Sequence, residues 1–215
     1  MYNYPVDTAN LPPTDKGRQY EIRAIGLREF AGLRNDKQQL DPFALARYAK
    51  LLVVPFEAIK DLMPEDIVEH LLGAGSDKWS GGASGLPLPN GQKLIILNPT
   101  HSPTRHQATL MEEISHVFLG HRPSRLAIKN YNKDGQEIAR DYRPEIEEQA
   151  YSVGAAALVP FSALRDFIRE GKTSRQIARH FNVSRELVEY RMKVSRLWQN
   201  YLEIMKGNIV FEEEE

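Results

Sequence analysis

The sequence predicts a mostly helical α+β fold with a small sheet and a helical C-terminal segment. Two kinds of pattern support this prediction. A capping residue followed by proline, as in Asp41-Pro42 and Ser102-Pro103, marks the start of a helix. Short apolar runs bounded by turn residues, at Leu51–Val54 and Lys93–Leu97, predict strands instead.

The first half of the chain contains three predicted helices. They cover residues 20–33, residues 42–50 and residues 64–72, the last ended by Gly73. A β-hairpin is predicted over residues 86–97, because the turn dipeptide Asn90-Gly91 lies between two apolar segments. Pro87 and Pro89 would confine its first arm to the edge of a sheet.

The second half is predicted to be helical around one long excursion. Helices are expected over residues 102–119, stopped by Gly120, and over residues 144–158, stopped by Pro160. Residues 122–143 form the excursion, with a turn expected at residues 132–135. Two further helical segments are expected within residues 173–206, on either side of Asn182.

The composition excludes several kinds of site. The 215 residues contain no cysteine, so disulfides, thiolate metal sites and a cysteine nucleophile are excluded. A net charge of −1 gives no overall attraction to nucleic acid or to an anionic membrane. The start of the chain lacks the features of a signal peptide, and no apolar run approaches the ~20 residues that span a bilayer. The expected location is cytoplasmic, without a membrane partner.

The predicted helix over residues 102–119 carries a candidate metal site. On a helical wheel, Glu112, Glu113 and His116 share an arc opposite the apolar residues. Glu112 and His116 are four residues apart, so both can reach one ion. This is the spacing of the zincin motif His-Glu-x-x-His, whose second residue, here Glu113, is the general base. An amphipathic surface helix without a metal would show the same pattern.

The other nearby histidines are weaker candidates. His121 follows His116 by five residues and is predicted to point elsewhere. His101 and His106 are predicted to be surface residues.

A third ligand is needed, because two protein ligands rarely hold zinc. The helix over residues 144–158 offers Glu145, Glu147 and Glu148. Glu147 shares a face with Ala150 and Gly154, where small side chains allow close helix packing, and it is the predicted third ligand. Alternatively, these glutamates serve only as favourable charges at a helix N-terminus.

The order of these features resembles the ImmA/IrrE family of metallopeptidases over residues 20–201. The resemblance rests on four segments, in chain order: Ile96-Leu97-Asn98-Pro99; Arg105 followed by Thr109 to His121; Glu147-Glu148-Gln149-Ala150 through to Pro160; and Ile177-Ala178 with Phe181-Asn182-Val183-Ser184 before Arg191.

The resemblance implies a zincin-like metallopeptidase core that cleaves a specific regulatory protein, such as a helix-turn-helix repressor, with metal-activated water. By position, it implies Glu112, His116 and Glu147 as metal ligands and Glu113 as the catalytic general base. The expected parts are a flexible N-terminal segment (residues 1–17), the zincin-like domain (18–165), a helix-turn-helix-like helical segment (166–206) and an acidic tail (207–215).

Glu112 departs from the family pattern, which has histidine at the first ligand position. One divalent ion is expected, zinc first, with manganese or another hard ion as the alternative because carboxylates suit harder ions. The extra negative charge should weaken the ion as a Lewis acid and make activation of water harder. The alternative function is therefore a catalytically inactive pseudo-peptidase that acts as a sensor or a protein-interaction regulator.

The basic helix–turn–helix pattern over residues 173–193 suggests a further alternative, a DNA-binding regulator. Ser184, Arg185, Glu189 and Tyr190 would then lie near the groove. The favoured interpretation is a helical hairpin packed on the catalytic domain, because the charge of the whole chain gives DNA binding no support. A protein substrate is the expected partner, and DNA is the alternative.

Two further roles are candidates. The hairpin near Lys93 to Leu97 could pair with an extended substrate strand. Tyr142 or Tyr151 could stabilise an oxyanion, although a packed tyrosine is the favoured interpretation of each.

Overall fold

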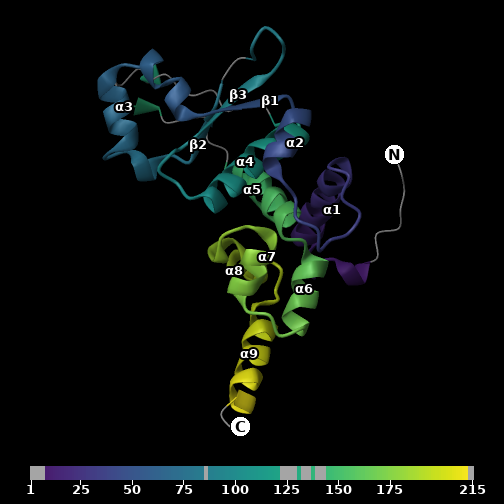
Figure 1. Ribbon diagram of the computed structural model, residues 1–215. Coiled ribbons are helices and arrows are strands. Elements are labelled where there is room, and N and C mark those ends of the chain that lie inside the picture. Colours follow the sequence, from purple (N-terminus) through teal and green to yellow (C-terminus); the bar gives the residue numbers. More distant parts are fainter. Residues whose placement is uncertain (1–7, 85–86, 122–129, 132–136, 139–143, 213–215) are drawn as a thin grey trace. The chain divides into compact units, whose positions relative to one another are not determined.

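The structure of the protein is a computed structural model (Figure 1), in which residues 8–84, 87–121, 130–131, 137–138 and 144–212 are described. The chain forms two compact units. The sheet unit comprises Asp41–Tyr151, and the helical unit comprises Met1–Leu40 together with Ser152–Glu215. Helix α5 (Pro144–Leu158) has residues in both units.

The sheet unit contains all the strands of the described residues. Its helices and strands, in chain order and apart from the part of α5 named above, are α2 (Pro42–Tyr48), β1 (Leu51–Val54), α3 (Glu65–Leu72), β2 (Gly81–Ala83), β3 (Lys93–Leu97), α4 (Pro103–Phe118), β4 (Asn130–Tyr131) and β5 (Glu137–Ile138). Short 3-10 helices lie at Phe56–Ala58, Lys60–Leu62 and Ser76–Lys78. The predicted class, α+β and mostly helical with a small sheet, is confirmed.

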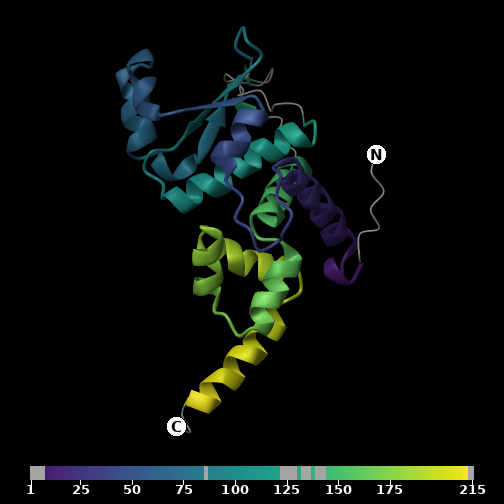
Figure 2. The ribbon, with the colours of Figure 1, turned by 45° about the vertical axis from the view of Figure 1, so that its right-hand side comes forward.

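Three strands form the sheet, in the order β1-β3-β2. β1 pairs parallel with β3, with Val53 opposite Ile95, and β2 pairs antiparallel with β3, with Gly81 opposite Leu97. Helix α4 crosses one face of the sheet, contacts β2 and β3, and packs against α2 (Figure 2). Its side chains Leu110 and Ile114 are fully buried, as is Ile95 of β3, so apolar burial holds this layer together.

The predicted hairpin was wrong in its first arm. The antiparallel partner of Lys93–Leu97 is the glycine-rich segment Gly81–Ala83 and not residues 87–89, whereas Leu86 lies outside the described residues. The tight turn is present, since Gly91 has a φ of 78° and its N–H donates to the carbonyl of Leu88. β3 is also the central strand, bonded on both sides, so the Lys93–Leu97 arm of the predicted hairpin has no free edge with which to pair with a substrate.

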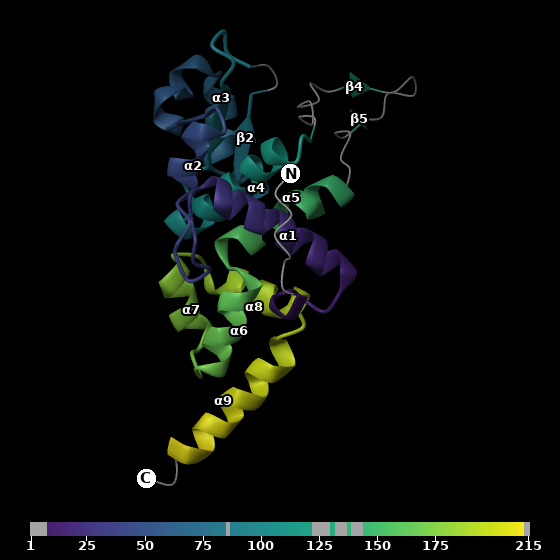
Figure 3. The same cartoon turned by 90° about the vertical axis from the view of Figure 1, so that its right-hand side faces the viewer.

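A second, two-stranded sheet lies within the long excursion. β4 and β5 pair antiparallel, with Asn130 opposite Ile138 and Tyr131 opposite Glu137 (Figure 3). The turn predicted at residues 132–135 lies outside the described residues.

The helical unit contains more helix than predicted. Its elements are η1 (Thr8–Asn10), α1 (Asp15–Phe30), the second half of α5, α6 (Phe161–Arg169), α7 (Ser174–Phe181), α8 (Arg185–Val194) and α9 (Trp198–Glu212). α1 begins five residues earlier than expected because the Thr14 hydroxyl caps it by accepting from the N–H of Gly17. α6 was not predicted, and α9 extends into the segment expected to be an acidic tail.

A buried ion pair joins α1 and α8 in this unit. Arg191 Nη2 lies 2.7 Å from Glu21 Oε2, and both side chains are less than 5% exposed, at 4% and 3%. Two more polar atoms of the pair are bonded: Glu21 Oε1 accepts from the N–H of Phe161, and Arg191 Nε donates to the carbonyl of Val159. Such additional hydrogen bonds help to offset the cost of removing both charges from water.

α7 and α8 are joined by a short turn in which Asn182 has a left-handed backbone, with φ of 53°. Ser184 caps α8 by accepting from the N–H of Leu187, as predicted. Arg191, one of the basic residues of this segment, is buried in the ion pair, and Arg185 is paired with Glu189 at 2.6 Å.

Within the described residues, every helix is too short or too polar to cross a bilayer.

Candidate metal centre

Helix α4 presents the predicted motif on a well-defined stretch of helix. The Ser102 hydroxyl caps its start by accepting from the N–H of Arg105, and Pro103 is the first helical residue. At its end, Gly120 has a φ of 69°, in the left-handed region that favours glycine. Both ends match the boundaries predicted from the sequence.

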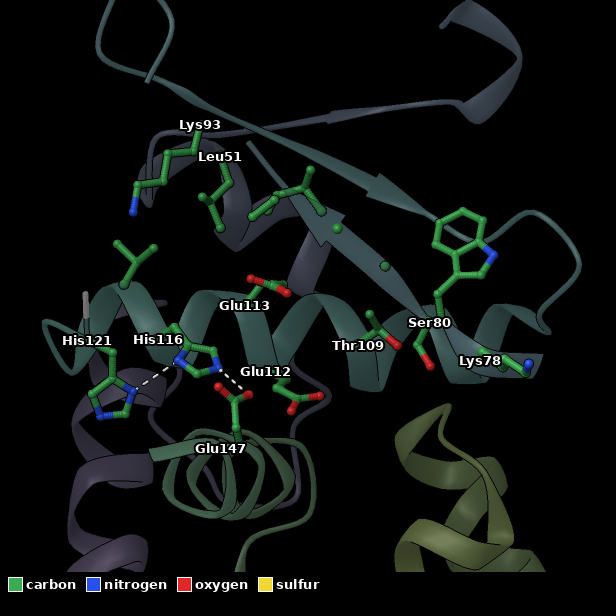
Figure 4. Close-up of a pocket in the computed structure, with 16 residues that line it drawn as sticks. Leu51, Lys78, Ser80, Lys93, Thr109, Glu112, Glu113, His116, His121 and Glu147 are labelled. Atoms are coloured by element: carbon green, nitrogen blue, oxygen red, sulfur yellow. Dashed lines mark hydrogen bonds and ion pairs between the residues drawn. The ribbon is translucent and has the colours of Figure 1, made fainter. Parts of the chain in front are cut away.

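Glu112, His116 and Glu147 come together in the sheet unit, the first two from α4 and the third from α5 (Figure 4). One ligand atom from each lies within 4.8 Å of the others. His116 Nε2 is 3.4 Å from Glu147 Oε2, and these side chains are 19% and 25% exposed. The structure thus gathers the three residues that the sequence predicted as ligands, and it selects Glu147 from the glutamates of its helix.

The carboxyl of Glu112 is in an unfavourable place for a negative charge. Burial, with Glu113 and Glu147 nearby, raises the pKa of Glu112 to about 7. A bound cation would offset both the burial and the repulsion between carboxylates.

His116 is suited to be a neutral ligand. Burial lowers the pKa of its imidazole, against the opposing effect of the Glu147 carboxylate. Its contact with Glu147 is therefore one between a neutral ring and a carboxylate at physiological pH, and not a full ion pair. A metal ligand must have a free nitrogen lone pair, which the neutral ring provides.

The cluster forms part of the wall of a pocket of about 320 Å³. Residues of β1, β2, β3, α4 and α5 line it, among them Glu113 and Thr109. Figure 4 shows Glu113 on the side of α4 that faces the strands, whereas Glu112 and His116 face Glu147. Besides the two carboxylates of the cluster, the pocket is thus lined by a third, that of Glu113, the residue predicted as the general base.

His121 was predicted to point away from the motif, but it lies against His116. Its Nδ1 lies 3.1 Å from His116 Nδ1, and its Nε2 lies 2.8 Å from Gln149 Oε1. The signal that could have found this contact is Gly120, since a left-handed residue there turns the chain back over the last turn of α4.

Asn98 is a buried residue that the sequence did not mark as part of the site. Its amide Nδ2 donates to the carbonyls of Ser76 and Trp79, at 2.7 and 2.9 Å, and its Oδ1 accepts from the N–H of Thr100. The Asn98 N–H also donates to the carbonyl of Ser80. Asn98 therefore holds the loop that leads into β2, one wall of the pocket.

His101 and His106 lie near Asn98 and are half-buried, although both were predicted to be surface residues. His106 Nε2 is 2.7 Å from the carbonyl oxygen of Asn98. Of the two tyrosines considered for an oxyanion, Tyr142 lies outside the described residues and Tyr151 is not among the residues that line the pocket.

The donor set fits a divalent metal ion. Two carboxylates and one imidazole are common zinc ligands, and three protein ligands with one open position are typical of catalytic zinc. Ligand atoms held about 2.1 Å from a tetrahedral ion are about 3.4 Å apart. His116 Nε2 and Glu147 Oε2 already have this separation. Glu112 has rotatable bonds that can bring its oxygen to the third corner.

The sequence profile of one protein family, described as the IrrE N-terminal-like domain (Peptidase_M78), matches residues 73–193. The match covers more than half of the 215 residues and includes α4 and Glu147. No curated protein matches the chain.

Proposed function

The chain belongs to the ImmA/IrrE family of metallopeptidases, and on that premise we propose that it is a metal-dependent endopeptidase that cleaves a specific regulatory protein. Membership of this family supports protease activity and a protein substrate. Glu112, His116 and Glu147 each offer a ligand atom within 4.8 Å of the others and line a pocket. This grouping is the main support for placing the metal site at these residues. A helix-turn-helix repressor is the substrate class proposed from the resemblance.

Glu112, His116 and Glu147 would hold the ion, with zinc as the first candidate and manganese as the alternative. When bound, a divalent ion supplies Lewis acidity to a peptide carbonyl and lowers the pKa of water. Glu112 contributes a negative charge where a histidine would be neutral, and its pKa near 7 means that it must give up a proton to bind a cation.

Glu113 would perform the proton transfers. Its carboxylate lines the pocket from the helix position next to Glu112. It would accept a proton from the attacking water and deliver it to the nitrogen of the leaving amine, which is the role of a general base followed by a general acid.

The substrate would bind along β2. This strand forms one edge of the three-stranded sheet and lines the pocket with Gly81, Gly82 and Ala83. An edge strand can add an extended peptide through main-chain hydrogen bonds. A side chain at Gly82 would meet nothing within 4 Å, so the backbone there is open to close approach by another chain.

Glu112 supports a second candidate function, a pseudo-peptidase that binds metal or protein without cleavage. A site with two carboxylates and one imidazole carries more negative charge than one with two imidazoles, which makes water harder to ionise. Such a protein would act as a sensor or an interaction partner through the same pocket.

The test is the metal content of protein purified without chelator, measured by inductively coupled plasma mass spectrometry. The parent is compared with Glu112→Ala, His116→Ala and Glu147→Ala, and with Glu148→Ala as the matched control on α5. The proposal predicts near-stoichiometric metal in the parent and the control, and loss in the other three. A parent that stays metal-free after reconstitution with zinc or manganese would overturn it.

Activity separates the two candidate functions. The metal-loaded parent and Glu113→Gln are incubated with a peptide library, and products are identified by mass spectrometry. Cleavage by the parent that is lost in Glu113→Gln, with metal retained in both, supports the endopeptidase. Metal binding without cleavage of either the library or candidate repressors supports the pseudo-peptidase.

A further inference from the structure

The end of α4 brings His121 against His116 through its backbone. The N–H of His121 donates to the carbonyl of His116 at 2.9 Å, and the N–H of Gly120 donates to the carbonyl of Val117 at 3.1 Å. Together with the positive φ of Gly120, these bonds form a Schellman motif. In this motif the residue after the glycine lies beside the residue three positions before the helix cap. The contact between the two rings therefore follows from the helix stop.

The two rings and Gln149 form a chain of hydrogen bonds. Gln149 Oε1, an acceptor, lies 2.8 Å from His121 Nε2, which must then carry the N–H. A neutral imidazole has one N–H, so His121 Nδ1 is an acceptor. His116 Nδ1, 3.1 Å away, is left as the donor.

From this chain we propose that His121, oriented by Gln149, holds His116 in the tautomer whose Nε2 is a bare lone pair facing Glu147. The inference rests on the proposed metal site and deepens it. His116 Nε2 and Glu147 Oε2 are 3.4 Å apart, longer than the 2.7–2.9 Å of a charge-assisted N–H···O bond. The contact is too long for a strong charge-assisted bond, so Glu147 alone does not hold a proton on His116 Nε2. Rotation of the Gln149 amide would reverse every donor and put a proton on His116 Nε2, which would block an ion.

His121 and Gln149 are thus positioning residues that do not touch the ion. Outer partners of this kind fix the tautomer and orientation of a ligating histidine, and their loss typically lowers metal affinity about 10–100-fold. Neither residue comes from the motif itself: His121 lies beyond the end of α4, and Gln149 lies on α5, two residues after Glu147.

The first test is independent of metal and of activity. The protein has six histidines, so selective ¹⁵N-histidine labelling gives a small set of ring signals, which substitution of His116 and His121 assigns. Long-range ¹H–¹⁵N spectra of the chelator-treated parent at pH 8 report the tautomer. We expect the Nδ1–H form for His116, retained in Gln149→Glu, which keeps the acceptor, and lost or mixed in Gln149→Met, which removes it. An Nε2–H form in the parent, or no change in Gln149→Met, would overturn the proposal.

The second test is zinc affinity, measured by competition with a chromophoric chelator. We expect a loss of about 10–100-fold for His121→Phe and a smaller loss for Gln149→Met. Unchanged affinity in both variants would overturn the positioning role. A parent that binds no zinc would count against the proposed function, and the tautomer measured in the spectra would still decide this inference. Gln149→Met changes a half-buried side chain, so it provides a folded variant if His121→Phe does not fold.

Discussion

Ionisation of Glu112 should make the metal-free protein less stable as the pH rises, and Glu112→Gln should remove this effect. The substitution keeps the size and shape of the side chain and removes its charge. Burial and the neighbouring carboxylates raise the pKa of Glu112 from 4.5 to about 7 in the folded protein. The unfolded chain therefore releases this proton at a lower pH than the folded one, and stability falls between these two pKa values.

The size of the effect follows from the shift. Each unit of pKa corresponds to about 1.4 kcal/mol, so full ionisation costs at most about 3.5 kcal/mol. Solvent reaches part of the side chain, which places the measured cost below that ceiling. Between pH 5 and pH 8, the difference in free energy of unfolding between Glu112→Gln and the parent should grow by about 2 kcal/mol in favour of the variant.

The assay is urea unfolding in the presence of EDTA at both pH values. A Trp198→Phe background leaves Trp79 as the one tryptophan, since the chain has two. Trp79 lies in the sheet unit, where its indole N–H donates to the carbonyl of Leu71 at 2.9 Å, so its fluorescence reports the unit that contains Glu112.

An equal difference in the free energy of unfolding between variant and parent at pH 5 and pH 8 would contradict this prediction. That result would mean that Glu112 does not titrate abnormally beside Glu113 and Glu147. A variant that becomes less stable than the parent at pH 8 would equally refute it, because the carboxylate would then be stabilised by the fold.

Three other predictions use different parts of the molecule. Gly81→Ala should destabilise the sheet unit by about 1–3 kcal/mol in urea unfolding, because the new methyl would lie 2.9 Å from a threonine methyl and 3.0 Å from a carbonyl oxygen. Gly82→Ala is the control: its new methyl meets nothing within 4 Å, so this variant should unfold like the parent. Glu21→Gln should cost about 3–5 kcal/mol by leaving the buried guanidinium of Arg191 unpaired, while Glu170→Gln, at an exposed pair, should leave the thermal midpoint unchanged. Zinc affinity, measured by chelator competition, should rise from pH 6 to pH 8, because the ion must displace the proton of the Glu112 carboxyl, whose pKa is raised to about 7. An affinity that does not change with pH would contradict this.

Local signals in the sequence predicted the parts of the fold that depend on local hydrogen bonds. Asp41 and Ser102 cap α2 and α4 in the structure, and Gly120 stops α4 where the pattern placed its end. A cap depends on a few neighbouring backbone groups, so a short stretch of chain is sufficient to specify it. The missed elements, α6 and the extent of α9, lie where such signals are weak.

Strand pairing depended on contacts between distant segments. The apolar run at Lys93–Leu97 indicated a strand, but its partners β1 and β2 were beyond what its own residues could specify. Gly81–Ala83 has poor intrinsic strand propensity and becomes a strand because it packs over α4 and pairs with β3.

The sequence was sufficient to place Glu112, Glu113 and His116 on one face of α4, because helical spacing alone aligns residues four apart. It also indicated Glu147, whose helix face could be worked out from the small residues that follow it. Packing between elements sets how close Glu147 lies to His116 and how deeply Glu112 is buried, and this burial is the main reason that the pKa of Glu112 is raised to about 7. Distances between different elements depend on the packing of the whole unit, and burial and charge act through those distances.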